Sequence, residues 1–290
     1  MSGWRHGEGR VNGLRLHWVE AGDGPLLLLL HGFPDFWYSR KLQIPALAQS
    51  GFHVVAPDLR GYNLSEKPKG ARSYRIEALV NDGLGLIEHF GAGQARLAGH
   101  DWGGAVAWAL AAAHPERVAR LAVLNSPHPA AMARELRRLR QLRRSWYIFF
   151  FQLPWLPEAA IRWRGFARLR RLLRRDPVRP HAFTDEDIRL YVEALAQPGA
   201  LTASLNYYRA AVRGMFRRRP KGSSHVGVPA LLIWGEQDRY LGLELTENME
   251  RWIPDLRVQR LPDASHWVHW DAPDEVNRYL LDFFTAPEHR

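Results

Sequence analysis

The sequence predicts an α/β fold with a mostly parallel central sheet, helices on both faces of the sheet and one inserted helical segment. Short apolar runs of strand length alternate along the chain with longer helical patterns, which is typical of a parallel sheet. The alternation stops between about residues 127 and 227, where only helical patterns remain, and then resumes. A chain of 290 residues is long enough for one such domain with an insertion.

The strands expected before the insertion are short. Residues 14–20 alternate between apolar and polar side chains, which is typical of a strand. The run Leu26–Leu30 is apolar throughout and is bounded by Gly-Pro and His-Gly pairs, as expected for a strand buried on both faces. Three further strands are predicted over residues 52–56, 96–99 and 119–124.

Helices are predicted between these strands, over residues 41–49 and 76–90 and in an alanine-rich stretch that ends at Ala113. After the insertion the pattern predicts two strands and two helices, over residues 230–234, 256–261, 243–252 and 276–284 respectively. The chain therefore divides into a predicted core domain (1–127 and 228–290) and a predicted helical cap (128–227).

Composition excludes several kinds of site. Cysteine is absent, so the chain has no disulfide, no thiolate metal site and no cysteine nucleophile. Residues 1–10 are polar and lack the apolar core of a signal peptide. The longest apolar runs, Leu26–Leu30 and Tyr147–Phe151, are far shorter than the ~20 residues of a spanning helix. We therefore expect a cytoplasmic protein.

The formal charge of +10 is concentrated in one segment. Residues 128–227 hold 21 basic and 7 acidic side chains, a balance of +14, whereas the remainder has 19 and 23, a balance of −4. We interpret the arginines as the solvated outer faces of cap helices. The alternative is attraction to an anionic membrane, an acidic partner or a nucleic acid. No nucleic-acid-binding motif accompanies the charge, so no nucleic-acid partner is expected.

The stretch Gly99–Gly103 has the G-x-nucleophile-x-G spacing of a sharp strand-to-helix turn that raises one side chain above the sheet. The raised residue is Asp101. A carboxylate is ionised near neutral pH without help from a base, and it can attack an electrophilic sp³ carbon to form an ester. The alternative is that Asp101 only caps the following helix.

Two further features follow predicted strands. The turn at His31-Gly32-Phe33-Pro34 can direct the backbone N–H of Phe33 toward Asp101, where it would form an oxyanion hole with the N–H of Trp102. An ordinary Gly-Pro turn is the alternative. Near the C-terminus, Asp238 and His266 complete the order nucleophile, acid, histidine. His266 is then the base that activates water, oriented by Asp238.

Competing side chains lie near these positions in the sequence. His100 and His269 are rival histidines, and Glu236 is a rival acid.

These motifs together resemble the epoxide hydrolases of the α/β-hydrolase superfamily, over nearly the whole chain. The matching stretches are HGFPDFWYSRKLQIPALA, APDLRGYNLSEKP, GHDWGG, GEQD and SHWVHWDAPDEVN, which begin at His31, Ala56, Gly99, Gly235 and Ser265. The resemblance implies the α/β-hydrolase fold, a small apolar epoxide as substrate, an Asp-His-Asp triad, and neither metal nor organic cofactor. It leaves the oligomeric state open, a homodimer included.

The resemblance also implies two cap tyrosines that hold the epoxide oxygen. Tyr147 and Tyr208 match these positions, with Tyr207 and Tyr191 as competitors. Haloalkane or haloacid dehalogenases of the same superfamily are the alternative activity. Haloalkane dehalogenases typically carry Asn where Phe33 stands, and fluoroacetate-type enzymes carry Arg where Trp102 stands, so both departures favour the epoxide. A non-catalytic or membrane-associating protein with the same fold is the alternative of another class.

Overall fold

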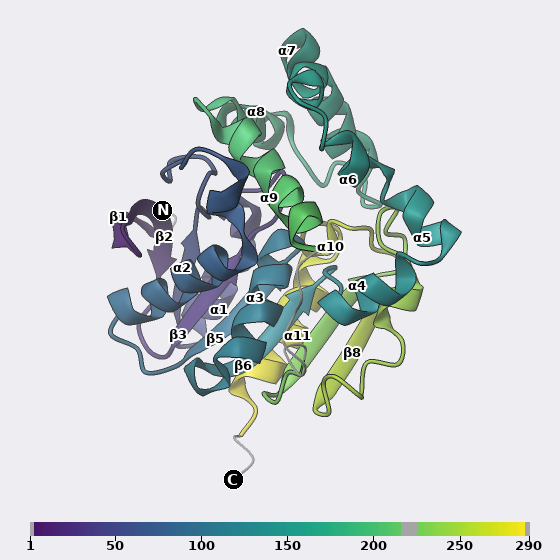
Figure 1. Ribbon diagram of the computed structural model, residues 1–290. Coiled ribbons are helices and arrows are strands. Elements are labelled where there is room, and N and C mark those ends of the chain that lie inside the picture. Colours follow the sequence, from purple (N-terminus) through teal and green to yellow (C-terminus); the bar gives the residue numbers. More distant parts are fainter. Residues whose placement is uncertain (1–2, 216–224, 288–290) are drawn as a thin grey trace.

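The computed structural model describes residues 3–215 and 225–287. Its centre is an eight-stranded sheet with the order β1-β2-β4-β3-β5-β6-β7-β8 (Figure 1). Strands β1 and β2, and β2 and β4, pair antiparallel, and every other neighbouring pair is parallel. The strands are β1 Arg5–Val11, β2 Leu14–Ala21, β3 Leu26–Leu30, β4 His53–Pro57, β5 Ala95–His100, β6 Val118–Leu124, β7 Ala230–Gly235 and β8 Leu256–Leu261. This topology confirms the predicted fold class.

Helices cover both faces of the sheet, because the central strands are apolar on both sides. Alternate residues of β3 pack into two separate clusters: Leu28 lies with α2 and α3, and Leu29 lies with α1 and α11. The four helices are α1 Ile44–Gln49, α2 Ile76–His89, α3 Trp102–Ala113 and α11 Pro273–Thr285. Short 3-10 helices η1 Trp37–Arg40, η2 Ala71–Tyr74, η3 Pro115–Arg117 and η4 Leu243–Thr246 and the short helix α10 Val268–Asp271 lie in the connections.

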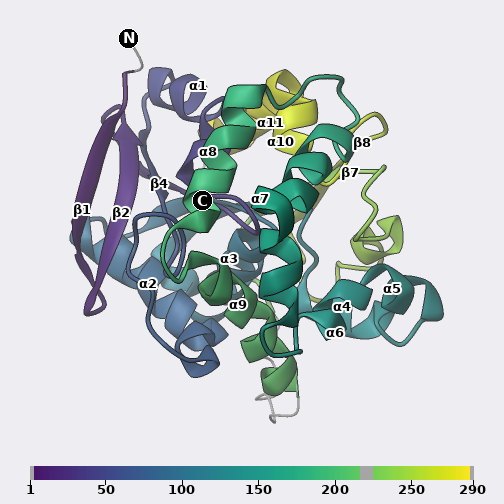
Figure 2. The same ribbon diagram turned by 90° about the horizontal axis from the view of Figure 1, so that it is seen from above.

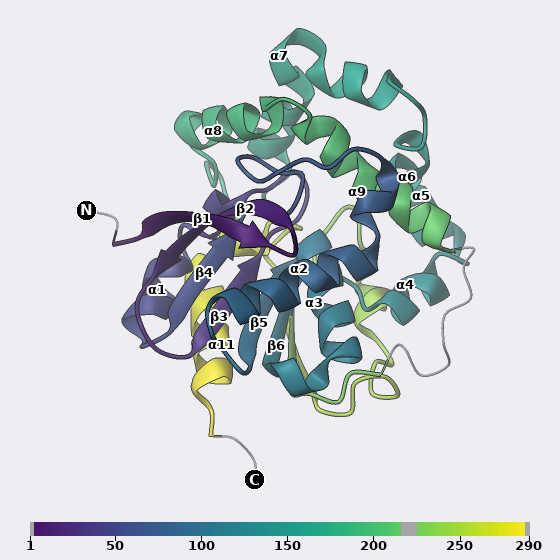
Figure 3. The same ribbon diagram turned by 60° about the vertical axis from the view of Figure 1, so that its left-hand side comes forward.

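A helical layer, α4–α9, lies between β6 and β7 in the chain. It comprises α4 Pro129–Glu135, α5 Leu139–Arg144, α6 Trp146–Phe150, α7 Leu156–Arg175, α8 Asp185–Ala196 and α9 Ala200–Met215. Figures 2 and 3 show α7, α8 and α9 together on one side of the sheet. Helix α7 is interrupted between Trp163 and Phe166, where Arg164, Gly165 and Phe166 have positive φ angles. The described part of residues 125–229 contains no strand.

The secondary structure differs from the prediction in three places. Strand β1 was not predicted, because its residues are mostly polar or glycine and do not alternate. The turn that pairs it with β2 is Asn12-Gly13, with φ angles of 49° and 78°, which is the strongest short hairpin signal a sequence can carry.

The helix predicted around residues 243–252 is only the short helix η4, Leu243–Thr246. Glu247 has an extended backbone with a φ of −99° and a ψ of 149°, which ends the helix, and Asn248 follows with a φ of 53°. The helix predicted over residues 41–49 is also shorter, because it begins at Ile44 with a proline in its first turn. Each predicted strand overlaps an observed one. Among the described helices, none is long and apolar enough to cross a bilayer.

Candidate active site

Asp101 lies at the turn between β5 and α3, with a φ of 49° and a ψ of −120°. This backbone is rare for a residue with a side chain, and the surrounding glycines make it possible. A Cβ on Gly99 would lie 2.4 Å from the Gly103 carbonyl oxygen, and one on Gly103 would lie 2.3 Å from that of Leu30. The strand and helix therefore approach closely enough to direct the Asp101 side chain away from the sheet.

The two carboxylate oxygens of Asp101 have different surroundings. Oδ1 accepts a hydrogen bond of 2.8 Å from the backbone N–H of Phe33. Oδ2 lies 3.8 Å from Nε2 of His266. Gly32 permits this approach, since a Cβ there would lie 2.4 Å from Oδ1. The carboxylate is thus held by one oxygen, and its other oxygen faces the imidazole.

Burial raises the pKa of Asp101 above its usual value. The neighbouring imidazoles and the backbone N–H groups of Phe33 and Trp102 oppose this effect by favouring the charged form. The carboxyl group is therefore less acidic than an exposed aspartate, and it is balanced by donors that stabilise negative charge at this position.

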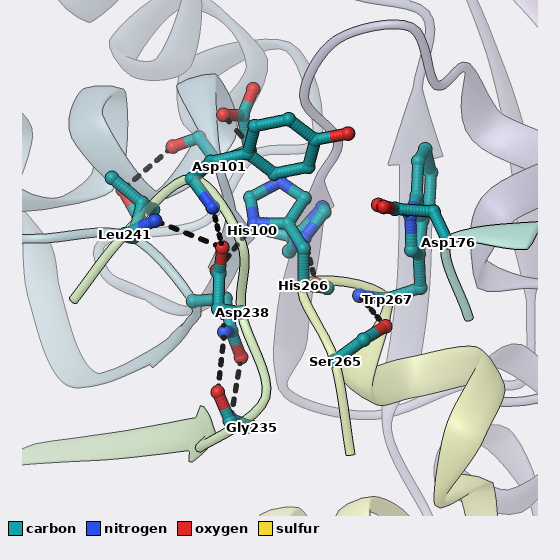
Figure 4. Close-up of polar contacts among 12 residues, drawn as sticks. His100, Asp101, Asp176, Gly235, Asp238, Leu241, Ser265, His266 and Trp267 are labelled. Atoms are coloured by element: carbon teal, nitrogen blue, oxygen red, sulfur yellow. Dashed lines mark hydrogen bonds and ion pairs between the residues drawn. The ribbon is translucent and has the colours of Figure 1, made fainter. Parts of the chain in front are cut away.

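Asp238 and His266 come from the loops after β7 and β8 and meet beside Asp101 (Figure 4). Nδ1 of His266 lies 2.7 Å from Oδ2 of Asp238. Oδ1 of Asp238 accepts the backbone N–H groups of Tyr240 and Leu241, at 2.7 and 2.9 Å. Burial opposes ionisation of Asp238, but His266 and these donors outweigh it and lower its pKa. The carboxylate is therefore charged and fixed in orientation.

The protonation of His266 follows from its two acidic neighbours. Burial alone favours the neutral imidazole, but the charge and hydrogen bond of Asp238, followed by the charge of Asp101, raise its pKa to about 9. His266 is therefore protonated at neutral pH when both carboxylates are charged. Loss of the charge on Asp101 removes one of the interactions that hold this proton.

A second buried group lies behind His266. His100 approaches the carbonyl oxygen of His266 with Nε2 at 2.9 Å and Oδ2 of Asp35 with Nδ1 at 3.1 Å. Asp35 also accepts the hydroxyl of Tyr191 at 2.9 Å. With His269, the ligand atoms of Asp35 and His100 lie within 4.8 Å of one another, close enough to hold a metal ion. Both Asp35 oxygens already take part in hydrogen bonds, so the structure explains this group as support for the His266 loop.

The two predicted tyrosines, Tyr147 on α6 and Tyr208 on α9, lie together over Asp101. Their ring centroids are 5.9 Å apart, and Tyr208 is 5.0 Å from Trp102 and 5.8 Å from Phe33. Burial, followed by the negative charge of Asp101, raises the pKa of both phenols well above the usual value. Both hydroxyls therefore stay protonated and can act as hydrogen-bond donors near the carboxylate.

The competing residues are engaged elsewhere or lie outside the site. The hydroxyl of Tyr207 donates to the backbone oxygen of Arg60 at 2.8 Å, and that of Tyr191 is bound to Asp35. Glu236 is exposed. His100 and His269 are fully buried behind His266. The structure therefore brings together all seven residues singled out from the sequence, which are Phe33, Asp101, Trp102, Tyr147, Tyr208, Asp238 and His266.

Two residues of the site were not expected. Asn125, after β6, donates to Oδ2 of Asp238 at 2.9 Å and accepts the backbone N–H of Gly235 at 2.9 Å. Its only sequence signal was its place directly after a predicted strand. Tyr240 packs its ring 5.5 Å from His266 and 5.8 Å from Tyr147, so it closes the side of the site. Nothing in the sequence distinguishes it from other loop aromatics.

Comparison with known proteins agrees with this architecture. The α/β hydrolase fold family matches residues 25–273. The chain is 46% identical to the AB hydrolase superfamily protein YfhM of Bacillus subtilis, over 94% of this chain and 95% of that protein. It is 38% identical to human epoxide hydrolase 4, over 94% of this chain and 76% of that protein.

Solved structures give the same relationship. A Bacillus megaterium epoxide hydrolase in complex with an inhibitor superposes with a TM-score of 0.90 at 36% identity, covering 97% of this chain and all of that one. Epoxide hydrolase A from Mycobacterium thermoresistibile gives 0.88 at 32% identity, covering 99% of this chain and all of that one. This chain is therefore a member of the α/β-hydrolase fold family and belongs to its epoxide hydrolases.

Proposed function

We propose that this protein hydrolyses a small apolar epoxide to a vicinal diol through an ester of Asp101. The observation that carries the proposal is the arrangement of the Asp101 carboxylate, with one oxygen bound to the N–H of Phe33 and the other 3.8 Å from His266. The named epoxide hydrolases among its relatives and structural neighbours support the same reaction. Asp101, His266 and Asp238 form the proposed catalytic triad.

The two oxygens of the Asp101 carboxylate have different roles in the first step. Oδ2 is the nucleophile, since Oδ1 is occupied by the Phe33 N–H. Oδ2 forms a bond to one epoxide carbon, and that carbon's bond to the ring oxygen breaks. Tyr147 and Tyr208 bind the ring oxygen, and one phenol transfers its proton to the leaving alkoxide. The product is a hydroxyalkyl ester whose carbonyl oxygen is Oδ1.

Ester formation also prepares the second step. It removes the negative charge of Asp101, so the pKa of His266 falls from about 9, and the imidazole gives its proton to the phenolate and can then act as a base. His266 then takes a proton from water, and the hydroxide attacks the ester carbonyl carbon. The oxyanion on Oδ1 is stabilised by the N–H groups of Phe33 and Trp102, which form the proposed oxyanion hole.

Collapse of this intermediate breaks the ester bond and releases the diol, which takes a proton from His266. The proton left on the Asp101 carboxyl group passes to His266, which restores the charged carboxylate and the protonated imidazole, so the net reaction is epoxide plus water to diol. The proposed steps use water, the side chains named above and the two backbone N–H groups of the proposed oxyanion hole.

We infer that the helical layer is the cap of this site, within the predicted cap segment 128–227 and above the core domain of residues 1–127 and 228–290. Residues 216–224 of that segment lie outside the described chain. The support is that Tyr208 contacts Trp102, the residue after Asp101, and that Tyr147 contacts Tyr240 in the loop that carries Asp238. The aromatic lining, which includes Phe151 and Phe33, favours an apolar substrate. We propose a cytoplasmic location.

The test is a pair of variants incubated with styrene oxide and with a panel of alkyl and fatty-acid epoxides. Asp101→Asn is expected to form no diol. His266→Gln is expected to accumulate an ester on Asp101, seen by mass spectrometry of the intact protein as an increase equal to the mass of the epoxide. Wild-type protein incubated with haloalkanes and fluoroacetate serves as the comparison. Halide release without diol formation would replace the epoxide hydrolase assignment with a dehalogenase.

A further inference from the structure

The segment from α5 into α7 exposes large apolar side chains to an unusual extent. Eight of the thirteen exposed large apolar residues in the described chain lie between residues 139 and 163. The aromatic patch, as we define it here, consists of Trp146, Phe149, Trp155 and Trp163, which are 63%, 53%, 81% and 63% exposed. A tryptophan is ordinarily a largely buried residue, so three exposed ones, on α6, on α7 and directly before α7, indicate a surface that binds a partner.

The same helices expose unpaired positive charge. Helix α7 contains seven arginines and one acidic residue, Glu158, whose carboxylate is already bound to Arg209. Five exposed arginines of α7 form no ion pair with any described residue, and we call them the free arginines: Arg162, Arg164, Arg168, Arg171 and Arg175. The apolar side of the second half of α7 packs inward through Phe166, Leu169 and Leu173.

Arg168, Arg171 and Arg175 thus follow from the packing of the second half of α7, which turns its remaining side chains outward.

The patch lies at the outer edge of the molecule. Helix α7 is the element farthest from the sheet in Figures 1 and 3, and Figure 2 looks down on it. It is continuous in the chain with α6, because only Phe151–Trp155 separate them. A surface that contacts α7 therefore approaches the molecule from the side of the helical layer, away from the sheet.

We propose that helices α6 and α7 bind an anionic lipid surface. Tryptophan rings favour the boundary between headgroups and acyl chains, and arginines beside them attract anionic headgroups while their aliphatic stems lie against apolar surface. A nucleic acid or an acidic protein would satisfy the arginines but would leave a patch of three tryptophans without an apolar partner. The surface lies outside the site of epoxide hydrolysis and adds a peripheral membrane contact to the activity proposed above.

The experiment is vesicle flotation of the full chain. Vesicles of phosphatidylcholine are compared with vesicles that contain about one third phosphatidylglycerol, at low and high salt. The apolar contribution is removed by Trp155→Ser with Trp163→Ser, and the charge contribution by Arg168→Gln with Arg171→Gln. The matched control is Arg257→Gln with Arg278→Gln, which removes the same charge from exposed positions on β8 and α11.

The wild type is expected to bind anionic vesicles, and high salt should weaken the binding. Loss of the two α7 arginines should weaken it by about 25-fold, since each contributes about fivefold near such a surface. Loss of the two tryptophans should weaken it by at least about tenfold. The control pair should change it by less than about twofold, because those arginines lie beyond the Debye length from the lipid. Circular dichroism and thermal unfolding check that each variant is folded.

Three results would overturn the proposal. The first is a wild type that does not float with anionic vesicles. The second is a control pair that weakens binding as much as the α7 pair, which would assign the effect to overall charge. The third is a protein that does not bind vesicles but self-associates in sedimentation experiments, with the self-association abolished by the tryptophan substitutions. That outcome would mean a second copy of the chain covers the patch.

Discussion

The loops that carry the proposed triad and the helical layer above them hold their functional side chains by different interactions. Asp238 and His266 are buried and linked to each other and to backbone groups by hydrogen bonds of 2.7–2.9 Å. Tyr147 and Tyr208 are held mainly by aromatic rings 5.0–5.9 Å away. The core therefore fixes charge and proton position, whereas the layer fixes the shape of an apolar space and two donors within it.

The difference follows from the chain segments that supply each region. The triad residues follow strands of one parallel sheet, whose carboxyl ends meet at the same edge. The tyrosines lie on separate helices that the chain inserts between β6 and β7. Substitutions in the core loops should accordingly affect ester hydrolysis, and substitutions in the helical layer should affect ester formation.

The largest effect is expected in the core, at Asp238. In Asp238→Asn the amide oxygen should turn toward the N–H groups of Tyr240 and Leu241, which leaves the amide NH₂ facing Nδ1 of His266. The imidazole then carries its proton on Nε2 and cannot accept one from water. We expect the steady-state rate to fall by about 10⁴-fold, by analogy with other triads. Stopped-flow and mass measurements should show that the ester forms and persists.

An Asp238→Asn variant that slowed ester formation as much as ester hydrolysis would contradict this division of roles, because the aspartate would then act on both steps.

A smaller effect is expected in the helical layer. Tyr147→Phe and Tyr208→Phe each remove one donor to the ring oxygen, and single-turnover ester formation should slow by about 10²-fold in each. Ester hydrolysis should keep its wild-type rate, so no ester accumulates. The matched control is Tyr207→Phe, since that hydroxyl donates to the backbone of Arg60 and not into the site.

Tyr207→Phe should leave the rate of ester formation within about twofold and cost about 1 kcal/mol of stability, measured by urea unfolding. Equal slowing in all three variants would mean that the helical layer acts only through its packing.

The charge balance of the core should also be visible without substrate. The pKa of His266 is about 9 in the folded protein, and its ordinary value of 6.5 applies to the unfolded chain. The interactions of the protonated imidazole therefore stabilise the fold fully below pH 6.5. That stability is lost as the pH rises through 9. We expect the wild type to lose about 3 kcal/mol between these limits relative to His266→Gln. Parallel unfolding curves for the two proteins across this range would contradict the assignment.

A related pH effect is expected on the first chemical step. Because burial raises the pKa of Asp101 above its usual 3.8, the rate of ester formation should decline with falling pH before an exposed aspartate would titrate. Single-turnover rates between about pH 4 and 7 measure this. A rate that stays constant to pH 4 would show that the carboxyl group keeps its ordinary acidity.

Much of the core site could be predicted from the sequence because it depends on local rules. The glycines around Asp101 are needed for the close approach of strand and helix, and the order of Asp101, Asp238 and His266 follows the order of strands. Asn125 and Tyr240 were missed because their importance depends on contacts with residues distant in the sequence. Asn125 binds Asp238, and Tyr240 packs against His266. No local pattern carries that information.

The layer was predicted less completely. Its helical character was evident from the pattern, but the interruption of α7 at residues 163–166 was not, because only Gly165 suggests a left-handed backbone there. The arginines were interpreted as a solvated face. The structure adds the exposed tryptophans between them, which the sequence alone would assign to the core.

The central claim is that the Oδ2 atom of Asp101, and not water, attacks the epoxide. The most direct test is a single turnover in ¹⁸O-labelled water with enzyme in excess over epoxide. We expect unlabelled diol from this first turnover and one ¹⁸O atom in the Asp101 side chain, found by peptide mass spectrometry. Labelled diol with unlabelled Asp101 would contradict the account, because water would then have attacked the epoxide directly.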